Sequence, residues 1–276
     1  MRTSDNTVLS VERALRLIDE LAEAPDGLSL SEMASRLIVN KAIASRLLDT
    51  MERANYVWRD DVAQRWHLTY RVSNLGLRQL QQSGLLGQST GILRHLAERT
   101  GELVRLSVVE RGERITWVHA VPGARRAVRI DPSFNFDVSL HTHATGKAWL
   151  MTLDPARVVE LVSRDGMAAL TPFSQTDLEA LRGELETARR RGFAATYQEN
   201  ELGVGAVAAP ILVDRLSGTR ECVGAVSVAA PTNCMSRADI EACGPLAAEA
   251  ASRLEQIWPL DENAGIRRWS GADTAG

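Results

Sequence analysis

The sequence is short of cysteine, lacks a strong net charge and contains no long hydrophobic run. Its three cysteines, Cys222, Cys234 and Cys243, are an odd number without C-x-x-C spacing, which argues against a disulfide framework or a zinc knuckle. No apolar run approaches the roughly 20 residues that a membrane-spanning helix needs, and the polar start MRTSDNT is no signal peptide. We therefore expect a cytoplasmic protein with no membrane partner.

The charge balance confines any nucleic-acid contact to one region of the chain. The formal net charge is −3 at pH 7, whereas residues 29–78 hold eight Lys or Arg against five Asp or Glu. A local positive field favours a few phosphate contacts that weaken steeply with salt. With 276 residues, of which 45% are hydrophobic and 24% charged, the chain is long enough for two globular domains.

Residues 29–53 predict two short helices with a tight corner between them. Ser29 and Glu32 form a capping-box pattern at the start of the first helix, Ile38 and Val39 form the corner, and Asn40 can cap the second helix. Apolar residues at helical spacing turn inward: Leu30, Met33, Ala34 and Leu37 in the first helix, and Ile43, Ala44, Leu47, Leu48 and Met51 in the second. This pattern predicts a helix-turn-helix.

The outer side of the second helix presents small and polar side chains around two cations. These residues are Lys41, Ala42, Ser45, Arg46 and Asp49. A DNA major groove admits such a ridge, because short side chains let the helix approach while Lys and Arg reach phosphates or guanine edges. An ordinary surface helix pair has the same spacing, so this segment alone leaves both interpretations open.

Two β-rich runs, residues 56–59 and 64–68, directly follow the second helix and are joined by Asp60-Asp61-Val62-Ala63. A further helix is predicted over residues 10–22, with Val11, Ala14, Leu15, Ile18 and Leu21 turned toward the core. Three helices and a two-stranded wing in this order predict a winged helix-turn-helix domain. We assign it residues 8–69.

A polar helix is predicted over residues 70–82, where Ser83-Gly84 interrupts it. Its apolar stripe is narrow, which suits a linker that pairs with its copy in another subunit. We assign the linker residues 70–90 and expect the next helix to begin at Ile92 and to end at a Gly101 C-cap.

Beyond the linker, the pattern changes from helical to strand-like. Strands are predicted over residues 103–109, 115–119, 127–130, 193–197, 206–213 and 222–229, and the last two are apolar enough to be central. Helices are predicted over residues 155–162, 176–191 and 236–257. The fold class is therefore α+β, with a central antiparallel sheet in a second domain over residues 91–260 and a loose tail over residues 261–276.

Residues 140–150, LHTHATGKAWL, predict a strand end that runs into a helix. Small residues ahead of a helix leave its first amides free to bind an anion, and the Thr142 and Thr145 hydroxyls add further donors. A carboxylate ligand would fit this corner. A plain capped helix start explains the same residues equally well.

Four segments together carry a resemblance to a known family. They are SLSEMASRL with ASRLLDTMERANYV, LAERTGELVRLSVVERGERITWVHAVPG, SLHTHATGKAWL, and RGFAATYQENELGVGAVAAPI with AVSVAAP. In the order and spacing of these segments, the chain resembles IclR-type transcriptional regulators over nearly its full length. The resemblance implies a winged helix-turn-helix, a linker helix and a GAF-like effector-binding domain. It also implies a homodimer or homotetramer that represses or activates an operon when a small carboxylic or aromatic acid binds the C-terminal domain.

Carried over residue by residue, the resemblance implies two sets of binding residues and no cofactor beyond the small-molecule effector. The operator DNA-binding set is Ser29, Lys41, Ala42, Ser45, Arg46, Arg59 and Arg65. The effector-binding set is Phe134, Phe136, Leu140, His143, Ala144, Thr145, Gly146, Thr196, Ala206, Ser227 and Ala229.

The chain departs from the family pattern in the DNA-binding region and in the effector-binding region. Family members often have a glycine in the corner occupied here by Ile38-Val39-Asn40 and another where Asn55 stands, although Asn tolerates a left-handed backbone. The position of Ala206 is cysteine or polar in parts of the family, and that of Ala229 is serine. The segments ITWVHAVPG and RIDPSFNFDVSLHTHATGKAWL resemble most closely the members that sense small oxo or hydroxy acids such as glyoxylate.

Two other function classes fit the sequence less well. His141 and His143 could form half of a metal site, completed by Cys222 or Glu199, which would make the protein a zinc- or nickel-sensing regulator, but H-x-H spacing alone is weak evidence. An enzyme is disfavoured, because Gly203-Val204-Gly205 is too short for a dinucleotide loop and no G-x-S-x-G elbow occurs. We expect no catalytic residue.

Overall fold

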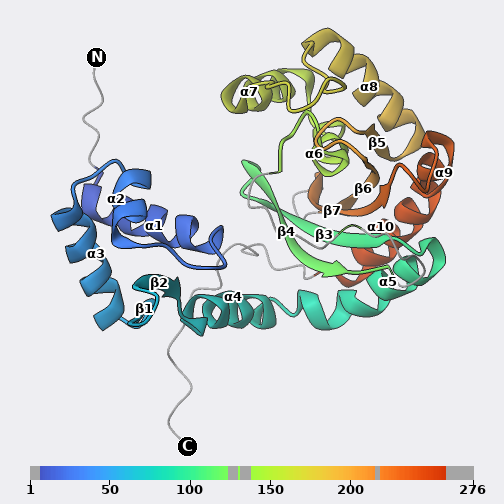
Figure 1. Cartoon of the computed structure of the whole chain (residues 1–276). Helices are drawn as coiled ribbons and strands as arrows, with labels where there is room; N and C mark the ends of the chain where they lie inside the picture. The colour runs from blue at the N-terminus through green and yellow to red at the C-terminus, as the bar shows by residue number, and fades with distance from the viewer. Residues whose placement is uncertain (1–6, 124–129, 131–137, 215–217, 259–276) are drawn as a thin grey trace, which may run out of the picture. The chain divides into compact units, whose positions relative to one another are not determined.

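The computed structural model of the chain describes residues 7–123, 130, 138–214 and 218–258. The chain divides into two compact units, residues 1–82 and residues 83–276 (Figure 1). Within the described residues, no helix is both long enough and apolar enough to cross a membrane.

The N-terminal unit is a winged helix-turn-helix, as predicted. Its elements are α1 (Leu9–Ala22), α2 (Leu30–Arg36), α3 (Lys41–Arg53), β1 (Val57–Asp60), β2 (Arg65–Leu68) and α4 (Tyr70–Gln82). Strands β1 and β2 pair antiparallel, and a bridge between Leu28 and Trp66 ties the chain before α2 to the wing. Leu17, Met33 and Leu48 are fully buried, so each of the first three helices contributes one side chain to the centre of the core.

The buried face of α1 differs from the prediction. Leu17 and Leu21 are buried, whereas Val11 and Leu15 are 54% and 58% exposed. Apolar residues cover a wide arc of this helix, and Leu15 and Leu17 lie about 200° apart around its axis, so both cannot face one small core. The expectation that Val11 and Leu15 turn inward is therefore wrong.

The capping residues of the helix-turn-helix act as predicted. Ser29 Oγ accepts a hydrogen bond from the Glu32 amide, and the Glu32 carboxylate accepts one from the Ser29 amide, which completes the capping box. The Asn40 side chain accepts a hydrogen bond from the Ile43 amide in the first turn of α3. Ile38, in the corner, has a φ of 55° and is 85% exposed. A β-branched residue thus occupies a left-handed position that favours glycine.

The helix that follows α4 begins earlier than predicted. Gly84 has a left-handed φ of 68°, and α5 (Leu85–Thr100) starts directly after it. The predicted start at Ile92 is therefore wrong, and residues 85–90 lie in α5 rather than in a linker. Leu85 is buried in the C-terminal unit, and such packing overrides the weak helix propensity of the glycines in this stretch.

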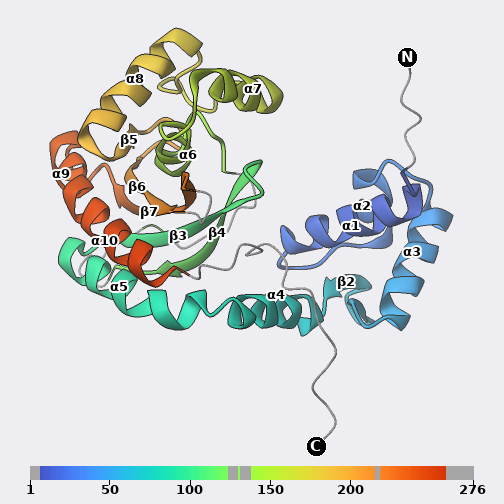
Figure 2. The same cartoon turned by 180° about the vertical axis from the view of Figure 1, so that it is seen from behind.

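The C-terminal unit is built on an antiparallel sheet, as predicted. Its strands are β3 (Leu103–Glu110), β4 (Arg114–Val121), β5 (Ala194–Tyr197), β6 (Val204–Asp214) and β7 (Arg220–Pro231), in the spatial order β4-β3-β7-β6-β5. The apolar strands β6 and β7 are both interior, as their sequences predict (Figure 2). Of the strand predicted over residues 127–130, only Ile130 is described, and it is not in a strand.

Helices cover both faces of this sheet, and each face has its own core. Helices α5 and α10 (Gly244–Ile257) pack on the face that carries Val104, Leu106 and Val226. Helices α6 (Ala144–Leu150), α7 (Pro155–Asp165) and α8 (Leu178–Arg191) pack on the face that carries Ala208 and Ala225 (Figure 1). The second face is the one that holds the predicted effector residues.

Three predicted boundaries in the C-terminal unit are corrected. The closing helix is two helices, α9 (Arg237–Ala242) and α10, because Pro245 in the first turn of α10 has no amide hydrogen with which to continue α9. Helix α7 continues beyond Val162 to Asp165. Residues 140–142 form a turn rather than a strand end.

Candidate DNA interface and ligand site

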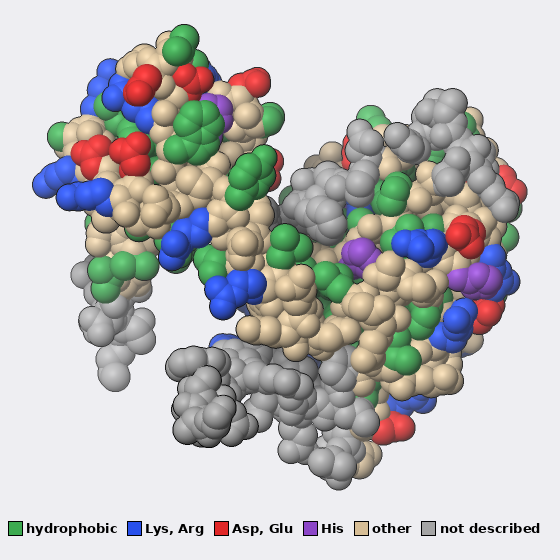
Figure 3. Space-filling view, turned by 90° about the horizontal axis from the view of Figure 1, so that it is seen from below, with side chains coloured by type: hydrophobic (Ala, Val, Ile, Leu, Met, Phe, Trp, Pro, Cys, Tyr) green, Lys and Arg blue, Asp and Glu red, His purple; other side chains and the backbone are tan. Residues whose placement is uncertain are grey.

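The outer face of α3 carries the candidate DNA contacts. Lys41, Ala42 and Arg46 are exposed and Ser45 is half-buried, while the opposite side of the helix is buried in the core. Arg46 Nε donates to the Ala42 carbonyl at 3.4 Å, and among the described residues neither Lys41 nor Arg46 forms an ion pair. On the visible face of the N-terminal unit, cationic side chains lie among acidic ones, in keeping with the small local charge excess (Figure 3).

Arg65, a predicted DNA contact, is held by the domain itself. Its Nε donates to the Asp26 carbonyl at 3.0 Å, its Nη2 donates to the Gly27 carbonyl at 2.9 Å, and Nη2 also lies 3.2 Å from a Glu32 carboxylate oxygen. These contacts fasten the wing to the start of α2, where Ser29 serves as the N-cap. They use Nε and Nη2 of Arg65, and a DNA contact by this residue stays a prediction.

Arg59 is the exposed arginine of the wing. It lies on β1, donates to the Gln64 side chain and stands 5.9 Å over the Trp66 ring. At the wing tip, the Asp60 carboxylate accepts hydrogen bonds from the Ala63 amide at 3.0 Å and the Val62 amide at 2.8 Å, and these hydrogen bonds lower the pKa of Asp60. A phosphate contact by the exposed Arg59 stays a prediction.

On the α6 side of the sheet, predicted effector residues from three strands meet. Thr196 in β5 pairs with Ala206 in β6, which pairs with Ala229 in β7. In the next row, Ala208 pairs with Ser227. We call these five residues the floor. Paired side chains on one face of a sheet lie about 5 Å apart, so residues that are far apart in the sequence form one continuous surface of small side chains.

The turn before α6 packs tightly onto this helix. Leu140, Ala144 and Thr145 are buried, and His143 is half-buried at the N-cap without a capping hydrogen bond from its side chain. Gly146 permits the turn, because a Cβ atom there would lie 2.6 Å from Leu140 Cα. All five of these predicted effector residues are therefore brought together, and α6 contacts β5, β6 and β7, the strands of the floor.

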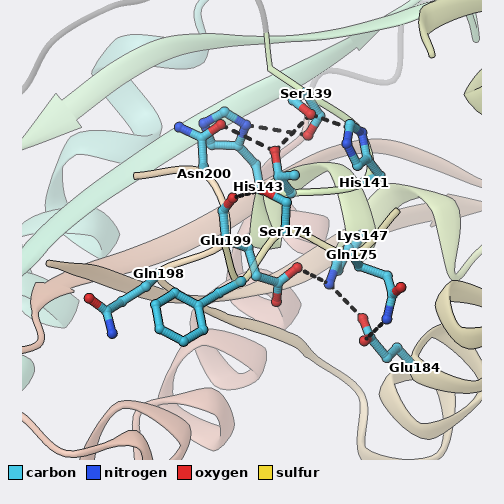
Figure 4. A network of polar contacts seen from close by, with 12 residues as sticks. Ser139, His141, His143, Lys147, Ser174, Gln175, Glu184, Gln198, Glu199 and Asn200 are labelled. Atoms are coloured by element: carbon cyan, nitrogen blue, oxygen red, sulfur yellow. Dashed lines mark hydrogen bonds and ion pairs between the residues drawn. The ribbon is translucent and has the colours of Figure 1, made fainter. Parts of the chain in front are cut away.

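Hydrogen bonds join the turn before α6 to the loop after β5. The Thr142 hydroxyl lies 2.7 Å from Ser139 Oγ and 3.2 Å from Asn200 Oδ1. His143 Nδ1 lies 3.3 Å from the Ser139 carbonyl oxygen (Figure 4). Burial lowers the pKa of His143 to about 4. Its imidazole is therefore neutral near pH 7.

Arg105 is a component of this region that sequence reasoning missed. It lies on β3 opposite Ser227 of the floor, and only 8% of it is exposed. Its guanidinium stands 4.6 Å over the Trp117 ring, and that ring meets the His143 ring edge-on at 5.1 Å. Burial lowers the pKa of Arg105, while the Glu201 carboxylate raises it. A single arginine in an otherwise apolar strand could have drawn attention to this position in the sequence, because buried charges are rare without a function or a partner.

Lys147 forms a second buried charge network that sequence reasoning missed. Its Nζ lies 2.6 Å from a carboxylate oxygen of Glu184 and 2.6 Å from one of Glu199, and Gln175 Nε2 donates to Glu184 (Figure 4). The Lys147 side chain is 2% exposed, and burial raises the pKa of Glu199 although Lys147 opposes this shift. This network lines a cleft of about 500 Å³ beside β5, and Thr196 of the floor also lies on its wall.

The structure does not support the metal-site alternative. His141 Nδ1 lies 3.1 Å from Ser139 Oγ and His141 Nε2 lies 3.0 Å from the Ala168 carbonyl oxygen, so both nitrogens are engaged. Burial raises the pKa of the Cys222 thiol to about 12, which disfavours the thiolate that a metal needs. Among the described residues, no group of three or more His, Cys, Asp or Glu side chains could hold a metal ion. The predicted contacts Phe134 and Phe136 lie outside the described residues.

A winged helix with an exposed cationic helix, followed by a separate α+β sheet domain, defines a class of two-domain transcriptional regulators. The model of the bacterial transcriptional regulator IclR C-terminal domain matches residues 77–256, and the model of the IclR helix-turn-helix domain matches residues 10–61. The chain therefore belongs to the IclR family of bacterial transcriptional regulators.

Similar proteins support this assignment over most of their lengths. The chain is 26% identical over 247 residues to the transcriptional repressor IclR of Escherichia coli K12, and the matched region covers 90% of this chain and 89% of that protein. It is 29% identical over 260 residues to the regulator BhcR of Paracoccus denitrificans, and the matched region covers 94% of this chain and 91% of that protein. A crystal structure of an IclR regulator from Alicyclobacillus acidocaldarius matches with a TM-score of 0.77 at 26% identity. The match covers 92% of this chain and 100% of that chain. These relatives are transcriptional regulators, not enzymes.

Proposed function

We propose that the protein controls an operon by binding operator DNA through α3, and that a small carboxylate metabolite bound in the C-terminal domain changes this binding. The observation that carries the proposal is the exposed ridge of α3, where Lys41 and Arg46 form no ion pair among the described residues. A cationic helix face of this kind reaches phosphates and guanine edges in a major groove.

The effector half of the proposal is supported by polar groups that gather at one place in the C-terminal unit. The floor supplies the Thr196 and Ser227 hydroxyls, α6 supplies Thr145 and its N-cap His143, and Arg105 supplies a positive charge beside Ser227. A small oxo or hydroxy acid of the glyoxylate kind, or an aromatic acid, has the chemistry for these groups. No metal or organic cofactor is proposed.

A homodimer is proposed because α4 has no buried residue in the N-terminal unit. Leu75 on this helix is 45% exposed, and Val72, one turn earlier on the same side, is only half-buried. A helix with such an apolar stripe is stabilised by pairing with its copy. Two α3 helices can then enter adjacent major grooves about 34 Å apart. Pairing of two dimers would give a tetramer. Because the chromosome lies in the cytoplasm of a bacterium, the proposed location is the cytoplasm.

A gel-shift titration tests this function. The probe is the DNA upstream of the neighbouring operon, and a random duplex of equal length is the control. We expect preference for the promoter fragment, loss of affinity with rising salt, and a shift in affinity when carboxylic acids are added. Equal affinity for both duplexes, with and without acids, would refute the proposal. Trp117 on β4 and Trp149 within α6, both in the core on that side of the sheet, provide a fluorescence signal for the acid itself.

A further inference from the structure

Lysine is almost absent from this chain, and arginine takes its place. Of the 32 Lys and Arg residues, only Lys41 and Lys147 are lysines, and both lie in the part of the chain that the structure describes. The two residue types differ in their chemistry, because a lysine amine is a target of acylation, whereas an arginine guanidinium keeps its proton in proteins. Acylation of side-chain amines is therefore confined to two positions.

Lys147 is closed to such chemistry by its surroundings. Its side chain is 2% exposed, and its Nζ lies 2.6 Å from a carboxylate oxygen of Glu184 and 2.6 Å from one of Glu199. These ion pairs hold the amine inside the C-terminal unit, where a reagent in solution does not meet it. Folding therefore leaves Lys41 as the accessible lysine.

Lys41 is exposed on every count that the structure provides. It is the first residue of α3, it follows the exposed corner residues Ile38 and Asn40, and its own side chain is exposed. Among the described residues its side chain forms no ion pair or hydrogen bond, and one turn along the helix stand Ala44 and Ser45 rather than an acid. Its amine therefore lies free in solvent.

Neither helix stability nor DNA contact explains why this position holds a lysine. A cation at the first position of a helix meets the positive end of the macrodipole, which is unfavourable for lysine and arginine alike. A phosphate contact is made at least as well by arginine, whose planar fork of donors the same helix already uses at Arg46. The property that lysine adds at position 41 is an amine that accepts an acyl group.

We propose that Lys41 is an acylation site, at which an activated acyl group from an acyl phosphate or a thioester weakens operator binding. Nζ attacks the acyl carbon and forms an amide bond, while the bond from that carbon to the phosphate oxygen or to the thiol sulfur breaks. Two protons leave the ammonium, one to the departing phosphate or thiol and one to water. This inference rests on the proposed function, because it needs α3 to contact DNA.

Acylation changes the DNA-binding face without disturbing the fold. It removes the positive charge and the donors of Lys41, so that each subunit loses one phosphate contact. We expect operator affinity to fall about tenfold, and the slope of log affinity against log salt to become shallower by about 1 per subunit. The N-terminal unit should unfold at the same temperature or higher, because loss of a cation at a helix start is favourable.

The first measurement locates the acyl group on native full-length protein. Acetyl phosphate is the probe in one arm and acetyl coenzyme A in the other, and peptide mass mapping follows each reaction. We expect acetylation of Lys41, with Lys147 unmodified until urea unfolds the protein, and the two arms identify the donor. Unmodified Lys41 in both arms would overturn the proposal, and so would equal acetylation of both lysines in native protein.

The second measurement compares operator affinity between treated and mock-treated protein by gel shift. Lys41→Arg is the matched control, because it keeps a cation at position 41 and every other reactive group of the chain. Its treated and mock-treated samples should bind the operator equally, whereas the treated wild type should bind about tenfold more weakly. Lys41→Gln has no charge at this position and should show the shallow salt dependence of the acetylated protein without treatment.

The outcomes separate this inference from the proposed function. If treatment weakens operator binding equally in wild type and in Lys41→Arg, another group is responsible and the role of Lys41 is refuted. If acetylated wild type binds the operator as tightly as the mock-treated sample, the acylation switch is refuted while the proposed function stands. The proposed function fails if untreated protein shows no preference for the promoter fragment over a random duplex.

Discussion

The two units of this regulator place their cations in opposite ways. In the N-terminal unit, Lys41 and Arg46 stand in solvent on one helix face. In the C-terminal unit, Arg105 and Lys147 are 8% and 2% exposed. Exposed cations keep their hydration and are ready to meet a polyanion, at an affinity that salt controls. Buried cations lose hydration and are stable only beside a defined anion. Lys147 has such anions in Glu184 and Glu199. The first arrangement suits contact with DNA, and the second stabilises the packing of a domain.

The largest expected effect comes from Lys147, the buried cation that is bound by two carboxylates. Lys147→Ala leaves Glu199 in its buried place without a counter-charge and should lower the free energy of unfolding of the C-terminal unit by about 3–5 kcal/mol. Urea unfolding followed by Trp149 fluorescence measures this change. Lys147→Met combined with Glu199→Leu removes both charges and should restore most of the loss. A single variant within about 1 kcal/mol of wild type would refute the buried-pair account.

His143 should make the C-terminal unit sensitive to acid. Its pKa is about 4 in the folded protein and near 6.5 in the unfolded chain, so the unfolded state binds the proton more readily as pH falls. The stability from this group is complete above the unfolded pKa, and about 2 kcal/mol of it should be lost between pH 7 and pH 5.

A comparison with His143→Gln isolates this titration from those of the neighbouring acids. The variant should show a smaller fall in unfolding free energy over the same pH interval, because glutamine binds no proton. Urea unfolding at both pH values gives the two differences. Identical pH dependence in wild type and variant would show that His143 is not held in its neutral form.

In the N-terminal unit, loss of the Arg46 cation should leave the free energy of unfolding unchanged. Arg46→Ala should weaken operator binding by about 1–3 kcal/mol and relax the preference at one base position. The melting temperature should stay the same, because Arg46 is exposed and its hydrogen bond lies within α3. Arg36→Ala, which removes an ion pair with Glu20 on the same unit, is the matched control and should bind the operator normally. An Arg46→Ala protein with wild-type affinity and specificity would exclude α3 as the recognition helix.

The smallest predicted effect is a gain in stability at the corner of the helix-turn-helix. Ile38→Gly should stabilise the N-terminal unit by about 1 kcal/mol, because the left-handed backbone disfavours a β-branched side chain and its exposed surface contributes little burial. Ile38→Ala keeps a Cβ at the same φ and should gain less. Chemical denaturation followed by helical circular dichroism measures both. A loss of stability in Ile38→Gly would mean that the isoleucine side chain makes a contact that its exposure does not suggest.

Much of the N-terminal unit could be predicted because its signals are local. The capping box of Ser29 with Glu32 and the cap at Asn40 place both helix starts within a few residues of each signal. The inward face of α1 was mispredicted, since apolar residues around most of a short helix do not say which of them the core accepts. Helix α5 was predicted to start late, because tertiary burial of Leu85 overrides a stretch that reads as a loop.

The candidate ligand site could be predicted only where the resemblance supplied positions. Thr196, Ala206 and Ala229 pair across three strands and lie together on the sheet. Their contact with an effector stays a prediction. Arg105 reaches the same surface through the register of β3 with β7, which no local pattern records. Likewise, the contact of Lys147 with Glu184 and Glu199 depends on how α6, α8 and the loop after β5 pack together.

The most direct test of the account is the operator affinity of one protein sample measured with and without a saturating acid. The account predicts that an oxo or hydroxy acid changes the dissociation constant for the promoter fragment by about fivefold or more. Identical operator affinity with and without every acid that binds the wild-type protein would contradict it, since ligand recognition would then have no consequence for DNA.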